Sequence, residues 1–220
     1  MYSVECEGRT RIYYEELVLW RGQGDLMMID NFDIRTKRKV TGIESKSIHL
    51  SYRYLITLGK DIYRIPETSA NNEVVLYKVD PKKPEHLIRL STLIKGKAFV
   101  DSSIIYYQNK FWLFTSVSGE MNLLYIFFAN EITGKFEPHK LNPIRVEKDA
   151  CRGAGNLFQL RDKLYRPTQN PLKRYGGSIV VSDIKVLNEY EYESITDFEI
   201  LPDKNYNLGI HNISFTQNMI

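Results

Sequence analysis

Cysteines and long apolar runs are scarce in this sequence. Only two cysteines, Cys6 and Cys151, occur in 220 residues, which is too few for a disulfide framework. We therefore expect reduced, idle thiols and a cytoplasmic location. The longest apolar run covers residues 123–129 and is too short to span a bilayer, and the acidic first residues lack the apolar core of a signal peptide.

An excess of charge of one sign is missing as well. The 30 Lys and Arg residues nearly balance the 27 Asp and Glu residues, which leaves a net charge of +3. One basic cluster stands out at residues 35–39, and we interpret it as a solvated turn. Proteins that bind nucleic acids usually concentrate basic side chains on one face, so a nucleic-acid partner is not expected.

The motifs of several enzyme classes are absent. The sequence has no Gly-x-Ser-x-Gly nucleophile motif, no glycine-rich phosphate loop and no dinucleotide fingerprint. Its four histidines and two cysteines are scattered without the spacing of a zinc site. The sequence therefore predicts no cofactor, and no set of side chains demands a metal ion.

A repeat of about fifty residues is the main feature that is present. Each copy contains an aromatic strand after a short polar turn, and four apolar positions match between copies: Ile12, Ile62, Phe111 and Leu164. Aromatic residues make up 12% of the chain, and such a composition favours strands. We find no convincing helix.

Further strands flank each aromatic strand. First strands are expected at residues 2–6, 50–58, 99–107 and 156–160, third strands at 25–30, 73–79, 122–129 and 178–184, and a fifth first strand at 210–216. An antiparallel unit of this length is the size of one propeller blade. The sequence therefore predicts a single all-β domain, a five-bladed β-propeller incomplete at its N-terminus, and the alternative is a β-sandwich with coincidental spacing. The expected blades cover approximately residues 1–47, 48–97, 98–150 and 151–208, with a partial blade at 209–220.

Two acidic residues at strand ends are candidates for catalysis. Glu67 follows an aromatic strand, and Asp101 lies on the first strand of the next repeat. Two carboxylates across a channel are the minimum machinery of a glycosidase, with Glu67 as general acid or base and Asp101 orienting the substrate or stabilising charge. The alternatives are structural. Glu67 pairs with Arg64 or a loop amide, and Asp101 caps its own turn through Ser103.

Other polar and aromatic residues at the same strand ends suit a ligand rich in hydroxyl groups. Sugars require paired donors and acceptors for hydroxyls and flat aromatic faces for their CH groups. Arg152 either contacts an anionic group or pairs with Asp101. For His49 and His211, the alternative to ligand binding is an ordinary structural role as hydrogen-bonded strand residues. The candidate substrate-binding residues are His49, Arg53, Arg152, Arg166, Gln169, Arg174, Tyr175 and His211.

Five segments resemble a known family. They are Ile65-Pro66-Glu67-Thr68-Ser69-Ala70-Asn71 with Val75-Leu76-Tyr77, Val100-Asp101-Ser102-Ser103, Arg152-Gly153-Ala154-Gly155-Asn156, Tyr165-Arg166-Pro167-Thr168-Gln169 with Arg174-Tyr175-Gly176-Gly177, and Gly209-Ile210-His211-Asn212. They resemble the propeller domain at the N-terminus of plant glucosamine inositolphosphorylceramide transferases. This domain also occurs in bacterial proteins, sometimes beside formyltransferase-like domains, and it is similar in architecture to five-bladed arabinanase and invertase-type glycosidases.

The resemblance implies a five-bladed propeller in a carbohydrate context. In the similar glycosidases three acids act; Asp101 matches the middle one, and Glu67 is the candidate in a neighbouring blade. The acid of the first blade would precede Met1, and Asn170 stands where the family favours Asp. These departures favour a binding role over hydrolysis. We also expect that the chain is either part of a longer protein or a shortened propeller whose ring is not fully closed. An open ring would expose strand edges that can pair with another chain or domain.

Three functions are compatible with these features. The first is a glycosidase-like enzyme that acts on the glycosidic bonds of a glycan or glycoconjugate. The second is a non-catalytic sugar-binding or scaffold domain that supports a transferase. The third is a protein-interaction propeller whose channel is filled by side chains. The expected partners are a carbohydrate or glycoconjugate ligand and a transferase domain or another chain, without nucleic acid and without a membrane span.

Overall fold

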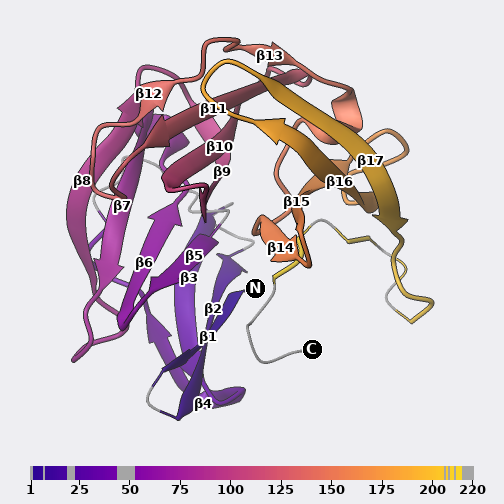
Figure 1. Cartoon of the computed structure of the whole chain (residues 1–220). Helices are drawn as coiled ribbons and strands as arrows, with labels where there is room; N and C mark the ends of the chain where they lie inside the picture. Colours follow the sequence, from indigo (N-terminus) through magenta and orange to yellow (C-terminus); the bar gives the residue numbers. More distant parts are fainter. Residues whose placement is uncertain are drawn as a thin grey trace. The chain divides into compact units, whose positions relative to one another are not determined.

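The computed structural model describes residues 2–6, 8–18, 23–43, 53–205, 207, 209–210 and 212–214. These residues form antiparallel sheets, and the only helical segments among them are two short 3₁₀ turns, η1 (Ser69–Asn71) and η2 (Lys148–Ala150) (Figure 1). The chain divides into two compact units, one of residues 1–99 with 216–220 and the other of residues 100–215. Among the described residues, no helix is long and apolar enough to cross a membrane.

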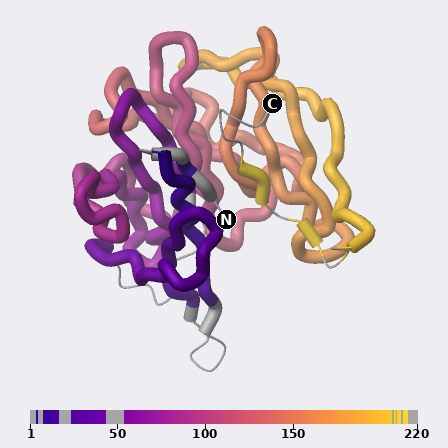
Figure 2. Tube along the Cα trace, turned by 90° about the horizontal axis from the view of Figure 1, so that it is seen from below, coloured from indigo at the N-terminus to yellow at the C-terminus, as the bar shows by residue number. Residues whose placement is uncertain are grey.

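The first unit contains two four-stranded sheets, each with its strands in chain order. Their traces run from indigo to magenta in Figure 2. The strands of the first sheet are β1 (Tyr2–Cys6), β2 (Arg9–Val18), β3 (Gln23–Asp30) and β4 (Asp33–Lys39). Those of the second sheet are β5 (Arg53–Leu58), β6 (Asp61–Pro66), β7 (Glu73–Val79) and β8 (Leu87–Lys95).

The second unit also contains two sheets, and the strand β9 begins at its boundary. The strands of its first sheet are β9 (Phe99–Tyr107), β10 (Lys110–Val117), β11 (Leu123–Ala129) and β12 (Glu137–Pro138), with β13 (Ile144–Arg145) also paired to β11. Those of its second sheet are β14 (Phe158–Leu160), β15 (Lys163–Asn170), β16 (Ser178–Leu187) and β17 (Tyr192–Ile200).

Tight turns join the first and second strands of each sheet, as the sequence predicts. Gln108 and Asn109 both have a positive φ, 49° and 62°, between β9 and β10. Gly59 between β5 and β6 has φ 60° and Arg161 between β14 and β15 has φ 56°. Left-handed residues give a two-residue hairpin the twist that matches its strands. These turns therefore set the register of the strands that follow.

The two sheets of each unit share a hydrophobic core. In the first unit, Tyr13 and Met28 of one sheet belong to the same buried cluster as Tyr77 of the other. In the second unit, Trp112 of β10 and Leu164 of β15 lie in one cluster. Burying the facing sides of two sheets against each other is what makes such a sheet stable in water.

Three of the four matching apolar positions of the repeat lie in the core. Ile12, Ile62 and Leu164 are buried. At the remaining copy Phe111 is half-buried and contacts the ring of Tyr106, whereas Trp112 is the fully buried residue. Because side chains alternate between the faces of a strand, the neighbouring residue takes the core position.

The fourth strand of each sheet was not predicted, and the interpretation of residues 35–39 as a turn is wrong. These residues belong to the outer strand β4. Lys37 contacts Glu16 at 2.9 Å, and Lys39 contacts Asp25 at 2.7 Å, both across the sheet. Glu16 lies on β2 and Asp25 on the adjacent strand β3, so acidic side chains of the same sheet stabilise this polar edge strand, which explains why a basic run is extended here.

The expected strand at residues 210–216 is described only in part. Ile213 forms an isolated parallel bridge with Gly155, and its N–H donates to the Ala154 carbonyl at 2.7 Å. Residues 211, 215 and 216 lie outside the described residues. The described part of the chain thus accounts for four sheets.

Candidate functional site

Asp101 lies on β9 in a conformation that is unusual for a strand. Its φ is 52°, and its side chain is only 4% exposed. Asp tolerates this left-handed conformation better than most residues, but it persists only where neighbours hold it. They do so here, because the hydroxyl of Ser102 contacts that of Thr115 at 2.7 Å and Thr115 donates to the Val100 carbonyl at 3.0 Å.

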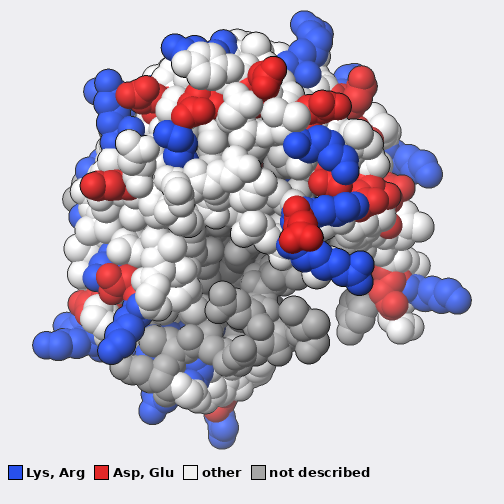
Figure 3. Space-filling view, in the orientation of Figure 1, with Lys and Arg blue, Asp and Glu red and all other residues white. Residues whose placement is uncertain are grey.

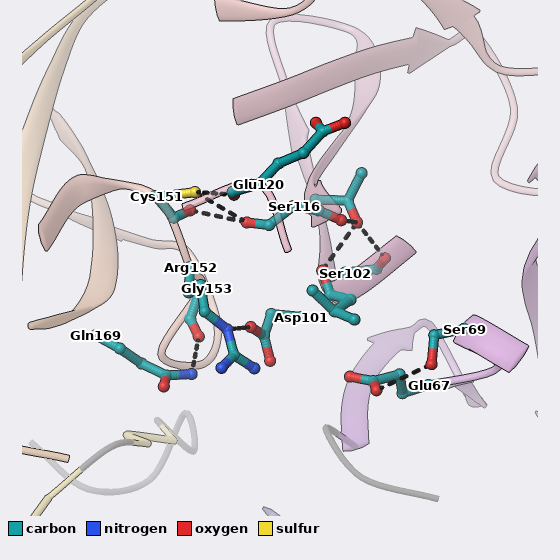
Figure 4. Close-up of polar contacts among 12 residues, drawn as sticks. Glu67, Ser69, Asp101, Ser102, Ser116, Glu120, Cys151, Arg152, Gly153 and Gln169 are labelled. Atoms are coloured by element: carbon teal, nitrogen blue, oxygen red, sulfur yellow. Dashed lines mark hydrogen bonds and ion pairs between the residues drawn. The ribbon is translucent and has the colours of Figure 1, made fainter. Parts of the chain in front are cut away.

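Arg152 pairs with Asp101, which is one of the two roles that the sequence left open for it. The Nε of Arg152 donates to Oδ2 of Asp101 at 2.6 Å, as Figure 4 shows. The Arg152 side chain is 39% exposed, in contrast to the buried carboxylate. A charge-assisted hydrogen bond of this kind fixes both groups, so the pair presents a guanidinium of defined orientation to solvent.

Two further predicted residues, Arg166 and Gln169 of β15, lie beneath the segment that carries Arg152. Both are 4% exposed. The guanidinium of Arg166 donates to the carbonyls of Ala150 and Cys151, and the amide of Gln169 donates to the Gly153 carbonyl at 2.8 Å. These two side chains therefore contact the backbone of the site and are turned away from solvent.

Arg174 and Tyr175 lie in the loop between β15 and β16, and both are exposed. Arg174 donates to the carbonyl of Asn207, while the Tyr175 side chain is 65% exposed. The loop is close to its neighbours: a Cβ added to Gly209 would lie 2.7 Å from the Gly176 carbonyl. Tyr175 thus offers an aromatic ring on a loop that is tied to the chain near residue 209.

Glu67 belongs to the first unit, whereas Asp101 belongs to the second. It follows β6, where it is half-buried, and the hydroxyl of Ser69 donates to its Oε1 at 3.3 Å. Arg64 is fully buried, with its guanidinium 4.2 Å from the centre of the Tyr13 ring. The pairing of Glu67 with Asp101 as two catalytic acids stays a prediction.

Three predicted residues cannot be placed. His49 and His211 lie outside the described residues, and so does the side chain of Arg53, whose backbone pairs with Pro66. The described residues contain no cluster of three or more side chains that could hold a metal ion. On the face shown in Figure 3, positive and negative side chains of the described residues are intermixed.

The family can be assigned from a direct comparison of sequences. The family described as "Glucosamine inositolphosphorylceramide transferase 1, N-terminal" matches residues 7–207. The chain belongs to this family. Proteins named glucosamine inositolphosphorylceramide transferase 1 from Oryza sativa subsp. japonica and Arabidopsis thaliana are each 29% identical, over 84% and 79% of this chain. The chain covers only 26% and 23% of their lengths.

Solved structures of glycosidases share the fold. An exo-β-1,3-galactanase from Clostridium thermocellum has a TM-score of 0.67 at 10% identity, over 87% of this chain and 47% of its own. An α-L-arabinofuranosidase from Podospora anserina, solved with cellotriose, has a TM-score of 0.64 at 10% identity, over 87% and 65%. These enzymes are β-propellers, so this member of the transferase family has a β-propeller fold.

This chain has Asn170 where the resemblance to the family predicts Asp. The amide of Asn170 forms a hydrogen bond with a neighbouring acidic residue. Its amide donates to Oε1 of Glu199 at 3.0 Å, and its own oxygen accepts from the N–H of Leu172. Hydrogen bonds from Ser178 and Asn170 lower the pKa of Glu199. An aspartate at position 170 would place a second carboxylate against Glu199, which explains why an amide suits this position.

Sequence reasoning missed the part that the backbone of residues 149–154 plays at the site. Cys151 is buried and free, as expected, but its carbonyl also accepts from Ser116 at 3.0 Å and its Sγ lies 3.3 Å from the Leu123 carbonyl. Backbone carbonyls leave no signal in an amino-acid sequence. Gly153 and Gly155, which follow Arg152 and have no side chains, were the one indication in the sequence that the backbone is closely packed here.

Proposed function

We propose that this chain is a carbohydrate-binding β-propeller domain that works beside a transferase in glycoconjugate assembly. Its ligand is a glycan or a sugar conjugate. The observation that carries the proposal is the pair of Asp101 and Arg152, held at 2.6 Å with the carboxylate buried and the guanidinium partly exposed.

The chemistry of this pair fits hydroxyl groups. A carboxylate accepts hydrogen bonds from hydroxyls, and a guanidinium donates several in one plane. Because the two groups fix each other, little conformational entropy is lost when a ligand binds. Tyr175 adds an exposed ring, and aromatic faces contact the CH groups of sugars.

The family supports the link to a transferase. The rice and Arabidopsis relatives are named as transferases, and this chain matches about a quarter of their lengths. We assign sugar recognition to this chain and the transfer reaction to a different part of such proteins. We propose that the propeller has five blades. The chain continues after β17, the last strand of the fourth sheet, and Ile213 in this continuation forms a bridge with Gly155.

A glycosidase-like hydrolase is the second candidate. It is favoured by Glu67 and Asp101, two acids at the strand ends where the predicted channel opens. Asp101, however, is engaged by Arg152, and Asn170 replaces the expected acid. A role in binding needs neither a matched acid and base nor a defined distance between them.

Thermal unfolding of the purified chain with a panel of monosaccharides, oligosaccharides and nucleotide sugars tests the proposal. A ligand at about 100 times its Kd stabilises by about 2.7 kcal/mol, which shifts Tm by several degrees. We expect at least one sugar to raise Tm, and Asp101→Asn to abolish that shift.

Asp183→Asn is the matched control. Asp183 is also a buried carboxylate of the second unit that is paired with basic side chains, in this case Lys185 and Lys163. The Asp183→Asn variant should lower Tm but keep the full ligand shift. If no sugar shifts the well-folded wild type, or if both variants keep the shift, the proposed site is wrong.

A further inference from the structure

The backbone around Arg152, residues 149–154, is held by hydrogen bonds to every one of its carbonyls. Each of the six consecutive carbonyls from residue 149 to residue 154 accepts a hydrogen bond from outside the segment. The donors in chain order of the carbonyls are Thr168 Oγ1, Arg166 Nη1, Arg166 Nη2 with Ser116 Oγ, Gln169 N, Gln169 Nε2 and Ile213 N.

The side chains that supply these bonds are themselves deeply buried. Thr168 is 0% exposed, Ser116 1%, and Arg166 and Gln169 4% each. Most loops satisfy their carbonyls with water at the surface. Here the protein buries polar side chains instead, and this arrangement determines the path of the segment completely.

Burial of Arg166 costs more free energy than burial of the other donors, because Arg166 is charged. Its guanidinium lies over the Phe114 ring at 5.8 Å, and among the described residues no carboxylate lies within ion-pair distance of it. Burying a cation without an acidic partner is unfavourable, so its hydrogen bonds have to compensate. They go to Ala150 and Cys151 at 2.6 and 2.5 Å, the two residues directly before Arg152.

We infer that Arg166 is a positioning residue: by holding the Ala150 and Cys151 carbonyls, it fixes the backbone from which Arg152 reaches Asp101 and the ligand. The inference deepens the proposed function and rests on it for the part that concerns a ligand. It replaces the expectation that Arg166 itself contacts the sugar. Arg152, at 39% exposure, is the more exposed of these two arginines.

The geometry makes a clear distinction between arginine and lysine at position 166. A planar guanidinium spans two neighbouring carbonyls with two nitrogens, whereas an ammonium is a single point donor. Arg166→Lys keeps the charge and most of the volume, so it should fold. It loses the bidentate contact, so the side chain at position 166 reaches only one of the Ala150 and Cys151 carbonyls, while the bonds from Thr168 and Ser116 to this segment remain.

The Nε–H signal of Arg152 in a ¹H–¹⁵N spectrum reports its position without any ligand. The signal is assigned by its absence in Arg152→Lys. In the wild type, the bond to Asp101 should protect this proton from exchange with water. We expect Arg166→Lys and Arg166→Met to speed this exchange about tenfold, because a hydrogen bond from a charged donor contributes at least about 1.4 kcal/mol, which corresponds to a factor of about ten.

A binding measurement with the sugar found in the panel supplies the second arm. Arg166→Lys should raise Kd about tenfold in the wild-type background and leave Kd unchanged in the Arg152→Lys background, because its effect passes through Arg152. Asp183→Asn should change neither the exchange rate nor Kd. A purely structural role for Arg166 would lower stability and leave both readouts as they are.

The two arms separate the inference from the proposed function. If no sugar binds the wild type, the proposed function fails, and the exchange of the Arg152 Nε–H still decides whether Arg166 positions it. If the sugar binds and Arg166→Lys raises Kd equally in both backgrounds, Arg166 contacts the ligand directly. If the folded Arg166 variants exchange at the wild-type rate, the inference is overturned.

Discussion

Asp101 and Asp183 are both buried carboxylates of the second unit, yet only one of them lies on a strained backbone. Asp183 occupies an ordinary position of β16, whereas Asp101 has φ 52° within β9. Strain of this kind costs about 1–3 kcal/mol and is concentrated at functional sites. This contrast supports the proposed role of Asp101 at a binding site, and it makes Asp183 a fair control.

Glycine and alanine at position 101 separate the backbone strain from the carboxylate. Both substitutions remove the ion pair with Arg152, but glycine adopts a positive φ without cost and alanine does not. We expect Asp101→Gly to be more stable than Asp101→Ala by about 1 kcal/mol in urea unfolding. At Ser103, whose φ is not in the left-handed region, the order should reverse. The same order at both positions would show that Asp101 is unstrained.

Asp183 should contribute a pH-dependent part of the stability. The hydrogen bond from Lys185 is the main cause that lowers its pKa, the bond from Lys163 acts in the same direction, and burial opposes them. A pKa lowered in the folded state stabilises the protein above the unfolded value of about 3.9 and stops doing so as the pH falls through the folded value.

Urea unfolding of the wild type and Asp183→Asn at several pH values measures this contribution. Because both lysines are about half exposed, the expected loss at pH 7 is modest, about 1 kcal/mol. The difference between the two proteins should shrink as the pH falls below about 4. A difference that stays constant down to pH 2 would contradict the role of the charge.

At this scale the sequence singled out a pair of residues that the structure brings into contact, but it did not indicate all of the contacts around that pair. Asp101 and Arg152 were both singled out, with their ion pair as an open alternative. Arg166 and Gln169 were expected to face the ligand, and the structure buries them beneath residues 149–154. Their contacts are with backbone carbonyls of η2 and of the segment between η2 and β14, so no spacing of residue types could reveal them.

At the scale of the element, the inner strands were predictable and the outer strands were not. The ranges expected for β7 and β9 agree with the structure at both ends. Inner strands are short runs rich in apolar and aromatic residues, bounded by turns, and these are strong signals. The outer strand β4 consists of charged residues in ion pairs, and β12 has two residues. Such strands form because a neighbouring strand pairs with them. Their own residues therefore carry little signal, since the pairing depends on a different segment of the chain.

The segment around Ile213 is an element whose position depends on one glycine. Gly155 has φ 126°, and an added Cβ would lie 1.8 Å from the Ile213 carbonyl oxygen. We expect Gly155→Ala to destabilise by about 3 kcal/mol, because the strained φ and the clash with backbone act together. Thermal or urea unfolding measures this loss.

Gly119→Ala is the control for the conformational part alone. Gly119 also has a positive φ, 86°, but an added Cβ would meet nothing within 4 Å. Its substitution should therefore cost about 1 kcal/mol. Equal losses at the two positions would mean that the close approach to Ile213 contributes nothing to the stability of this part of the chain.

At the scale of the whole molecule, the sequence predicted one domain and a repeated architecture. The structure has two compact units, each with two sheets around a shared core. The repeat made this architecture predictable because each copy contains the same hairpin and an apolar residue at a matching position, which is buried in three of the four copies. How many blades close the propeller depends on contacts between distant segments, which the repeat does not encode.

The assignment of Glu67 to one unit and Asp101 to the other makes the last prediction a test between binding and hydrolysis. If the sugar is held by the Asp101–Arg152 pair of the second unit, Glu67→Gln should retain the ligand-induced shift in Tm that Asp101→Asn loses. Incubation of the wild type with the bound oligosaccharide should release no shorter sugar, as measured by chromatography of the products. Hydrolysis by the wild type that is lost in both variants would instead establish two cooperating acids and a glycosidase.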